Sequence, residues 1–170
     1  MEITGKPLQS HTIISRDIIK TANPSSSHPH THNLSEIDIR ADKAYLPLLL
    51  LYPKNNSCSL TAEDKARVLK KSLSQCLTKY YHFAGRLPTH STPYIDCNDE
   101  GVVFFEARND SKLDEFPLSR VLDGNLDNLF PGDMVCYNSP RNANLVGVQL
   151  NHFACGGIGL VLVQAWLYTH

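Results

Sequence analysis

The sequence lacks the features that mark several large classes of protein. No apolar run among its 170 residues reaches the roughly 18 residues needed to span a bilayer, so we expect no membrane segment. Residues 1–12 lack the apolar core of a signal peptide, and the five cysteines are unclustered and odd in number. Free thiols in the reducing cytoplasm therefore fit this sequence better than a disulfide framework.

The sequence also has little excess charge of either sign. The formal net charge is −1, the isoelectric point is about 6.7, and the lysines and arginines are scattered along the chain. A nucleic-acid ligand requires a basic surface that contacts phosphates, so we expect no such partner. The length suits one domain, which would bury roughly 68–70% of its unfolded surface.

The most informative pattern is a pair of apolar runs on either side of a Cys-Gly-Gly turn at 155–157. In residues 146–153, apolar residues alternate with others, which predicts a strand with one buried face. Residues 158–163 are apolar throughout, which predicts a strand covered on both faces at the centre of a sheet. Together the two runs predict a buried hairpin.

Residues 61–80 carry the clearest helix signal. Thr61 and Asp64 approximate a capping box. Apolar residues then recur every three or four positions and predict one apolar stripe: Ala62, Ala66, Leu69, Leu73, Cys76 or Leu77, and Tyr80. Five basic residues lie largely off this stripe, at Lys65, Arg67, Lys70, Lys71 and Lys79. We interpret them as a solvated face, since a site for an anionic ligand would require them to face a shared cleft.

Other segments predict further strands. Residues 12–21 indicate a short opening strand, and residues 45–53 indicate an apolar strand that ends at a proline. Residues 94–108 read as a hairpin, with Gly101 suited to a left-handed position in its turn. It contains four acidic residues, at 96, 99, 100 and 106. We do not interpret them as a paired-carboxylate site, because the alternation of a strand and a solvated turn explain their positions. Residues 113–140 permit a short interrupted helix.

Residues 23–33 are polar, contain two prolines and predict an exposed loop. His28, His30 and His32 alternate within it, and an extended chain would place the three imidazoles on one side, where they could hold a transition metal. No cysteine or carboxylate lies within the cluster, and ordering a loop costs entropy. We therefore predict a solvated loop and no metal site.

Several segments resemble, in order, the plant BAHD acyltransferases, particularly their vinorine-synthase-like branch. Residues 80–87 (YYHFAGRL) resemble the family's Tyr-x-x-Ala-Gly-Arg-Leu stretch, and 153–157 (FACGG) resemble its Phe-x-Cys-Gly-Gly turn. Residues 33–38, followed by the apolar run 45–53, and residues 94–107 resemble further stretches of that family. The resemblance assigns seven structural motif residues, which are Tyr80, Ala84, Gly85, Arg86, Cys155, Gly156 and Gly157.

On the residues alone, the roles within 80–87 stay open. Gly85 suits a helix stop or a tight turn. Arg86 could anchor a carboxylate through a bidentate pair, but a surface arginine at a helix C-cap is the simpler interpretation. His82 lies between aromatic residues and is expected to be a packed side chain rather than a base.

The resemblance implies an α/β fold with a mixed sheet and flanking helices, corresponding to most of the N-terminal domain of a chloramphenicol-acetyltransferase-like two-domain enzyme. Residues 1–170 would then form a single incomplete domain, with 164–170 as an atypical tail and no C-terminal domain. The implied reaction transfers an acyl group from acyl-CoA, as co-substrate, to a hydroxyl or amine of a plant secondary metabolite. We expect no bound cofactor. An incomplete domain would expose an edge or apolar patch and favour association with a full-length relative.

The family's general base belongs to a His-x-x-x-Asp motif on the second strand of the Cys-Gly-Gly hairpin. His152 precedes the turn and is followed by Phe-Ala-Cys-Gly, so it lacks the motif's carboxylate and is not expected to be that base. Cys155 could act as an acyl-accepting thiol with His152 as its base, but no carboxylate is evident to orient the histidine.

Residues 164–170 resemble the end of the helix that follows the motif in the family. Either the motif segment has been lost internally, as by exon skipping or a faulty gene model, or the strand end diverges and His170 is the first motif residue of a truncated chain. We therefore assign no catalytic, substrate-binding or metal-binding residue and expect negligible activity from the chain alone. The alternative is a non-catalytic module that binds a partner or a ligand.

Overall fold

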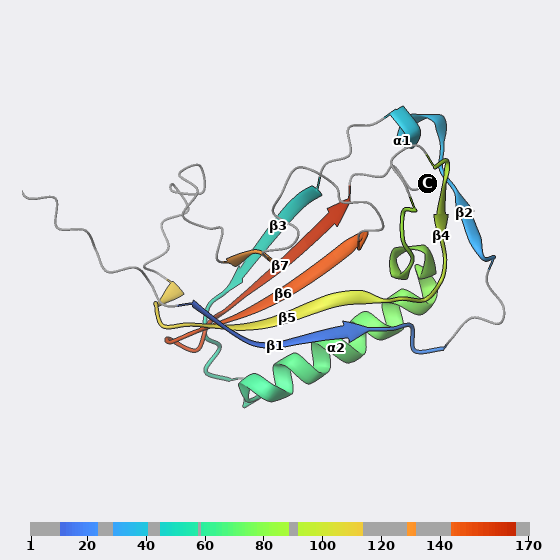
Figure 1. Cartoon of the computed structure of the whole chain (residues 1–170). Helices are drawn as coiled ribbons and strands as arrows, with labels where there is room; N and C mark the ends of the chain where they lie inside the picture. Colours follow the sequence, from blue (N-terminus) through green and yellow to red (C-terminus); the bar gives the residue numbers. More distant parts are fainter. Residues whose placement is uncertain are drawn as a thin grey trace, which may run out of the picture.

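The structure, a computed structural model, describes residues 11–23, 29–40, 45–57, 59–88, 92–113, 129–131 and 144–165 (Figure 1). The elements in chain order are β1 (His11–Ile19), β2 (Thr31–Asn33), α1 (Glu36–Arg40), β3 (Tyr45–Tyr52), α2 (Ala62–Lys79), the 3₁₀ helix η1 (Tyr81–Ala84), β4 (Tyr94–Asp96), β5 (Val102–Asn109), β6 (Val146–Phe153) and β7 (Ile158–Ala165). His28, most of the predicted helix in 113–140 and residues 166–170 lie outside the described residues.

Five strands form the main sheet in the order β1-β5-β6-β7-β3, and β2 pairs with β4 in a separate two-stranded sheet. β5 and β6 run parallel, whereas the other neighbours in the main sheet are antiparallel. The main sheet is therefore mixed, as expected. The predicted strands at 12–21 and 45–53 correspond to β1 and β3.

The predicted hairpin around the Cys-Gly-Gly turn is confirmed, but the burial of its two strands is the reverse of the prediction. β6 lies at the centre of the sheet and is buried at seven of its eight positions, while alternate residues of β7 are buried. The polar residues Gln149 and Asn151 suggested a solvent-facing side, yet both are fully buried. The amide of Gln149 donates to Asn151 Oδ1 at 2.9 Å, and that of Asn151 donates to the carbonyl of Leu129 at 3.0 Å, so part of their hydrogen-bonding capacity is met inside the protein.

The predicted hairpin at 94–108 is wrong. β4 pairs with β2, while β5 pairs with β1 and β6 in the main sheet. The connecting residues adopt positive φ at Asp99 (52°) and, as predicted, at Gly101 (90°), and the chain passes from one sheet to the other. The prediction of an exposed loop at 23–33 also needs correction, because the last three residues of that segment form the strand β2.

Helix α2 begins as the sequence predicts. The Thr61 side chain accepts from the Asp64 amide, and the Asp64 side chain accepts from the Thr61 amide, which completes the capping box. Leu77 is buried while Cys76 is exposed, which settles the stripe in favour of Leu77. No helix among the described residues is long and apolar enough to cross a membrane.

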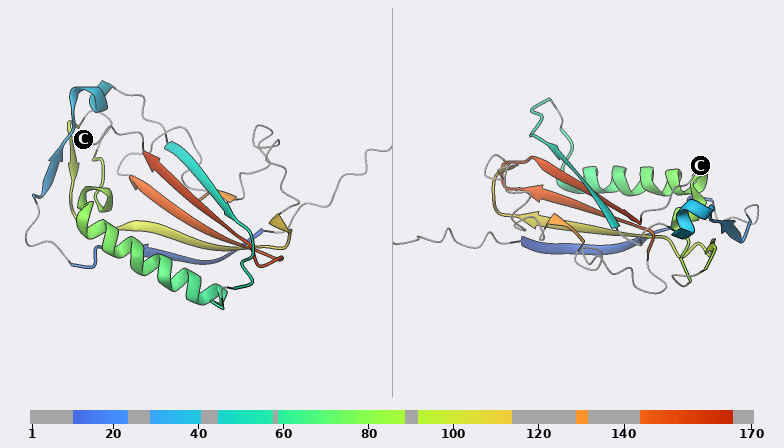
Figure 2. Two further views of the ribbon diagram at one scale, coloured as in Figure 1. Left: turned by 180° about the vertical axis from the view of Figure 1, so that it is seen from behind. Right: turned by 90° about the horizontal axis from the view of Figure 1, so that it is seen from above.

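One basic residue of α2 departs from the predicted solvated face. Lys70 reaches the sheet, where its Nζ lies 2.8 Å from Asp17 of β1 and 3.5 Å from Glu106 of β5. These ion pairs, together with the position of Lys70 over the Phe104 ring, fix α2 on the β1–β5 side of the sheet. Figure 2 shows α2 running along this side.

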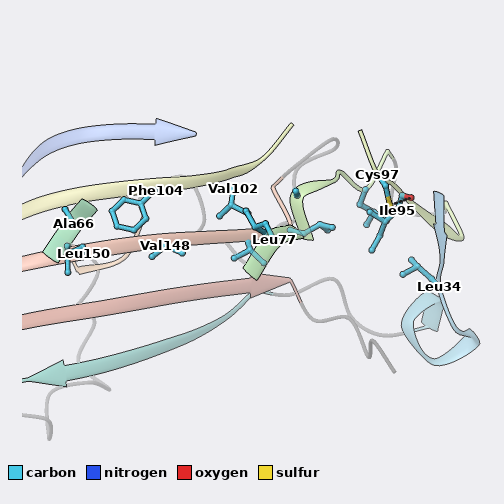
Figure 3. Close-up of a cluster of buried hydrophobic side chains, with 13 residues drawn as sticks. Leu34, Ala66, Leu77, Ile95, Cys97, Val102, Phe104, Val148 and Leu150 are labelled. Carbon is cyan, nitrogen blue, oxygen red and sulfur yellow. Dashed lines mark hydrogen bonds between the residues drawn. The ribbon is translucent and has the colours of Figure 1, made fainter. Parts of the chain in front are cut away.

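Two apolar clusters cover the two faces of the sheet. The first lies between α2 and the sheet and continues beneath η1 and β4 (Figure 3). The second lies on the opposite face and is built around Phe105, Leu129, Phe153 and Val161. The central strand contributes to both clusters, because alternate residues of a strand point to opposite faces.

Candidate functional site

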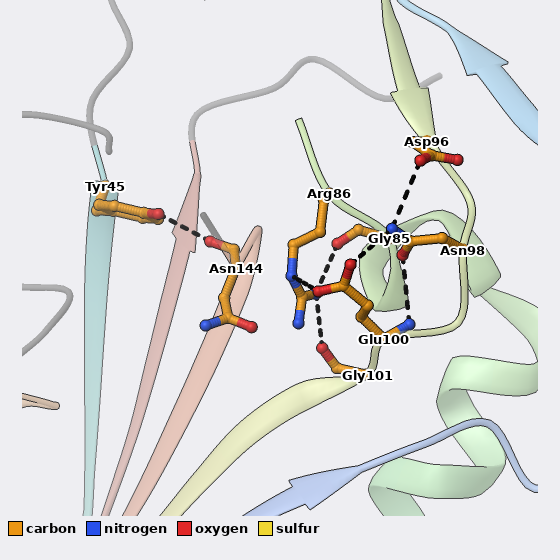
Figure 4. Close-up of polar contacts among 8 residues, drawn as sticks. All are labelled: Tyr45, Gly85, Arg86, Asp96, Asn98, Glu100, Gly101 and Asn144. Carbon is orange, nitrogen blue, oxygen red and sulfur yellow. Dashed lines mark hydrogen bonds and ion pairs between the residues drawn. The ribbon is translucent and has the colours of Figure 1, made fainter. Parts of the chain in front are cut away.

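A group of polar contacts surrounds Arg86, which follows η1 (Figure 4). Its side chain is not on the surface, because the residue is only 6% exposed. Nη1 donates to the carbonyls of Gly85 and Gly101, each at 2.8 Å, and Nε lies 3.0 Å from Glu100 Oε2. Burial lowers the pKa of the guanidinium, and the Glu100 carboxylate opposes that shift. The charge of Arg86 is thus directed at the turn that leads into β5.

The backbone of Arg86 joins the two sheets. Its amide and carbonyl exchange hydrogen bonds with Asp96 of β4, at 2.9 and 2.8 Å, and Arg86 also forms a β-bridge with Asn144, just before β6. The carbonyl of Asn144 accepts a 2.8 Å hydrogen bond from the hydroxyl of Tyr45, at the start of β3. Arg86 therefore connects β4, the turn before β5 and the ends of β6 and β3. These contacts suit a residue that positions strands rather than one that binds an external carboxylate.

Gly85 permits this close approach. Its φ is −87°, so a left-handed conformation does not explain the glycine. A Cβ at this position would lie 2.3 Å from the carbonyl oxygen of Asp96 and 2.9 Å from the side chain of Ile95. Gly85 is required because the β4 backbone packs directly against it. The predicted helix stop is also modified, since α2 ends at Lys79 and η1 intervenes.

The motif tyrosine needs a correction. Tyr80 caps the C-terminus of α2 and is 52% exposed, whereas Tyr81 packs against the apolar cluster beneath α2. Tyr81 also has the spacing to Ala84 that the Tyr-x-x-Ala motif requires. Ala84 itself is fully buried. The packing role therefore belongs to Tyr81 and Ala84.

The second group of motif residues lies at the other end of the β6–β7 hairpin. Gly156 has φ of 82° and provides the left-handed position in the turn, whose ends are joined by a 3.0 Å hydrogen bond from the Phe153 amide to the Gly157 carbonyl. The amide of Leu113 donates to the sulfur of Cys155 at 3.3 Å. The structure thus separates the two motif groups and gives the Cys-Gly-Gly group a role in closing the hairpin.

His152 and Cys155 do not form a catalytic pair in this arrangement. His152 Nε2 lies 3.0 Å from Glu106 Oε1, on the face covered by α2, and Glu106 is also paired with Lys70. Cys155 packs against the cluster on the opposite face of the sheet. The glutamate that orients His152 was not recognised in the sequence as its partner, because it comes from a strand 46 positions away.

Of the three histidines of the predicted loop, His32 has a packing role and His30 is exposed. The ring of His32, in β2, stacks on that of His82, in η1, with centroids 4.7 Å apart and an interplanar angle of 18°. Burial is the larger cause, and the nearby His32 the smaller one, of a lowered His82 pKa of about 4. This agrees with the expected role of His82 as a packed side chain rather than a base. No group of three potential metal ligands occurs among the residues that can be described.

Comparison with known proteins identifies a consistent set of relatives. The Transferase family model matches residues 10–163. A (13S,14R)-1,13-dihydroxy-N-methylcanadine 13-O-acetyltransferase of Papaver somniferum is 34% identical over 151 residues, which are 87% of this chain and 31% of that protein. An acylsugar acyltransferase of Solanum lycopersicum is 34% identical over 156 residues, covering 90% of this chain and 35% of that protein.

The fold has a counterpart among solved structures. The crystal structure of vinorine synthase matches 92% of this chain and 38% of its own, with a TM-score of 0.82 and 26% sequence identity. The chain spans about a third of the length of the curated relatives it matches.

Replacing Gly85 with alanine should destabilise the protein by about 1–3 kcal/mol, because the added methyl group cannot fit against the Asp96 carbonyl. Urea denaturation measures this change in the free energy of unfolding. Ser72→Ala, at an exposed position in α2, is the control and should change stability by less than about 0.5 kcal/mol. Equal stability of Gly85→Ala and the wild type would contradict the proposed packing.

The free energy of unfolding should fall between pH 6.5 and 4 partly because of His82. Its pKa in the folded protein, about 4, lies below the ordinary histidine value of 6.5, so the unfolded chain binds a proton that the folded protein excludes in this range. His82→Phe should retain the aromatic packing and reduce the loss of stability between pH 7 and pH 5 by on the order of 1 kcal/mol, after allowance for solvent screening. Urea denaturation at both pH values measures this. The control is His30→Gln, at an exposed position, and parallel pH profiles for His82→Phe and the wild type would refute the assignment.

Proposed function

This chain belongs to the plant BAHD acyltransferase family, and on that premise we propose that it is part of an enzyme that transfers an acyl group from acyl-CoA to a hydroxyl or amine of a plant secondary metabolite. The observation that carries the proposal is the match of nearly the whole chain, in both sequence and fold, to acyltransferases. In the reaction, a base removes the proton of the acceptor group, the acceptor attacks the thioester carbonyl, and CoA leaves as the thiol. The cytoplasm is the proposed site of the reaction.

The residues of this chain take structural roles in the proposed enzyme. Arg86 and Tyr45 fix the end of the sheet at which β7 finishes, where Ala165 pairs with Tyr45 and donates a 2.7 Å hydrogen bond to the Leu145 carbonyl. The Cys-Gly-Gly turn holds the other end of β7. Rigid positioning of this strand suits a site whose base follows it, because proton transfer requires the base to lie within hydrogen-bonding distance of the acceptor.

We do not assign the base to any histidine in the 170 residues. None of the seven histidines before His170 is followed four positions later by an aspartate, and His152 is engaged by Glu106 beneath α2. We therefore propose that the 170 residues have negligible transferase activity alone and that the base comes from the His-x-x-x-Asp segment of the intact family enzyme.

A chimera tests this proposal. Residues 10–163 would replace the matching segment of the Papaver somniferum relative, so that the relative supplies everything after residue 163, including the segment that follows β7. Transfer of radiolabelled acetyl from acetyl-CoA to the relative's own acceptor would be measured for the chimera and for the isolated chain. We expect turnover by the chimera and none by the chain alone.

Two controls make the result interpretable. Alanine in place of the motif histidine should abolish turnover by the chimera, and circular dichroism should report the same fold for both chimeras. A folded chimera without activity would contradict the proposal that this chain is a competent part of an acyltransferase. Activity of the isolated chain would contradict the absence of a base.

A non-catalytic module that binds a ligand or a full-length relative is the second candidate function. The engagement of His152 by Glu106 favours it, because the histidine closest to the family turn is already held in a structural contact. Binding of the acceptor or of the relative by the isolated chain, measured by calorimetry, together with a folded but inactive chimera, would support the module over the enzyme.

A further inference from the structure

The side-chain carbonyl of Asn144, two positions before β6, is a buried acceptor without a donor. Its oxygen, Oδ1, has no hydrogen-bond partner in the part of the chain that the structure describes. The backbone carbonyl of the same residue is satisfied, because it accepts a 2.8 Å hydrogen bond from the hydroxyl of Tyr45. An unpaired acceptor inside a protein is costly, so a donor to Oδ1 is expected from a group outside these contacts.

The pairing of β6 with β7 indicates where that donor comes from. Val146 pairs with Gln164, and the amide of Ala165 donates a 2.7 Å hydrogen bond to the carbonyl of Leu145. Because the two strands are antiparallel, a chain that continues past Ala165 runs toward Asn144. Consecutive Cα atoms lie 3.8 Å apart, so the first group after β7 comes within about one residue of the Asn144 amide. The segment that follows β7 is therefore the nearest source of a donor.

The position of Asn144 is fixed by residues on either side of it. Tyr45 binds its backbone carbonyl, and Arg86 forms a β-bridge with it (Figure 4). The guanidinium of Arg86 is directed elsewhere, at two glycine carbonyls and the Glu100 carboxylate. Neither Tyr45 nor Arg86 donates to Oδ1. The backbone of Asn144 is thus held firmly, while its side-chain carbonyl can accept from an incoming group.

We propose that Asn144 is a positioning residue for the base of the acyltransferase, and that its Oδ1 accepts a hydrogen bond from the ring N–H of the base histidine. This inference rests on the proposed function, in which the segment that follows β7 supplies that histidine. The hydrogen bond made by one ring nitrogen determines which nitrogen carries the proton. With its N–H held by Asn144, the ring presents its other, unprotonated nitrogen to the hydroxyl or amine of the substrate.

The charges near Asn144 suit a neutral acceptor at this position. The titratable groups that surround it are the Tyr45 hydroxyl on β3, the Arg86 guanidinium after η1 and, paired with that guanidinium, the Glu100 carboxylate. The charge of Arg86 is already opposed by Glu100, whose Oε2 lies 3.0 Å from Nε. An amide orients the base without adding a charge, whereas a carboxylate at position 144 would stabilise the imidazolium and raise the pKa of the base.

Substitutions in the chimera described above test the proposal, since residues 10–163 include Asn144. Asn144→Leu has a similar shape and no acceptor, so it should lower kcat about tenfold or more. The KM for acetyl-CoA should change less than about twofold, because the substitution removes orientation of the base and not substrate binding. Asn144→Asp retains an acceptor and should preserve most of kcat. It should also raise the pH at half-maximal rate by about half a unit or more.

Two controls separate positioning from a structural role. Asn56→Asp makes the same change of charge in an exposed turn beyond the far end of β3, a strand about 26 Å long, and should leave kcat and the pH profile unchanged. In the 170-residue chain without the relative's segment, Asn144→Leu removes an acceptor that has no donor. Its urea midpoint should therefore equal or exceed that of the wild type. A side chain with a structural role would lower that midpoint.

The outcomes distinguish this inference from the proposed function. A folded wild-type chimera without turnover would overturn both. An active chimera whose Asn144→Leu variant retains the wild-type kcat would overturn the inference alone. So would an Asn144→Asp variant with the wild-type pH profile, because the donor to Oδ1 would then be a group other than the ring of the base. If Asn144→Leu does not fold, as judged by circular dichroism, the pH profile of Asn144→Asp decides the question.

Discussion

Burial of β6 on both faces is the constraint on which the rest of the structure depends. The strand lies between β5, to which it is parallel, and β7, to which it is antiparallel, so its backbone hydrogen bonds are made within the sheet. Val148 and Leu150 face α2, while Phe153 faces the opposite cluster. Gln149 and Asn151 must then find partners inside the protein, because unpaired amides at this depth would be costly. The two motif groups hold the ends of the hairpin that contains this strand.

Local signals in the sequence predicted local structure well. The capping box at Thr61 and the spacing of Ala66, Leu69 and Leu73 predicted α2 because helix formation depends on residues three or four positions apart. The turn at 155–157 predicted the β6–β7 hairpin for a similar reason, since a short turn fixes the pairing of adjacent strands. The resemblance to BAHD acyltransferases predicted the fold class, which the comparison with vinorine synthase confirms.

The remaining features depend on residues far apart in the sequence. β5 follows β4 closely but pairs with β1, about 90 positions earlier, so alternation alone suggested a hairpin that does not form. Arg86 is buried because Glu100 and the carbonyl of Gly101 bind its guanidinium. A single sequence does not indicate that these residues are its partners. The polar residues Gln149 and Asn151 suggested that one side of β6 faces solvent. Alternation of polar and apolar residues cannot distinguish a side that faces solvent from one that carries a buried amide network. The same limit applies to the candidate site, whose motif residues were found but whose contacts were not.

The central claim is that β6 forms the protected centre of a domain of the acyltransferase family. Hydrogen exchange, followed by mass spectrometry, tests this most directly. The account predicts that the amides of β6 exchange slowest and that those of the edge strand β3 exchange at least about tenfold faster. Protection of β3 equal to that of β6, or slowest exchange in β7, would contradict it.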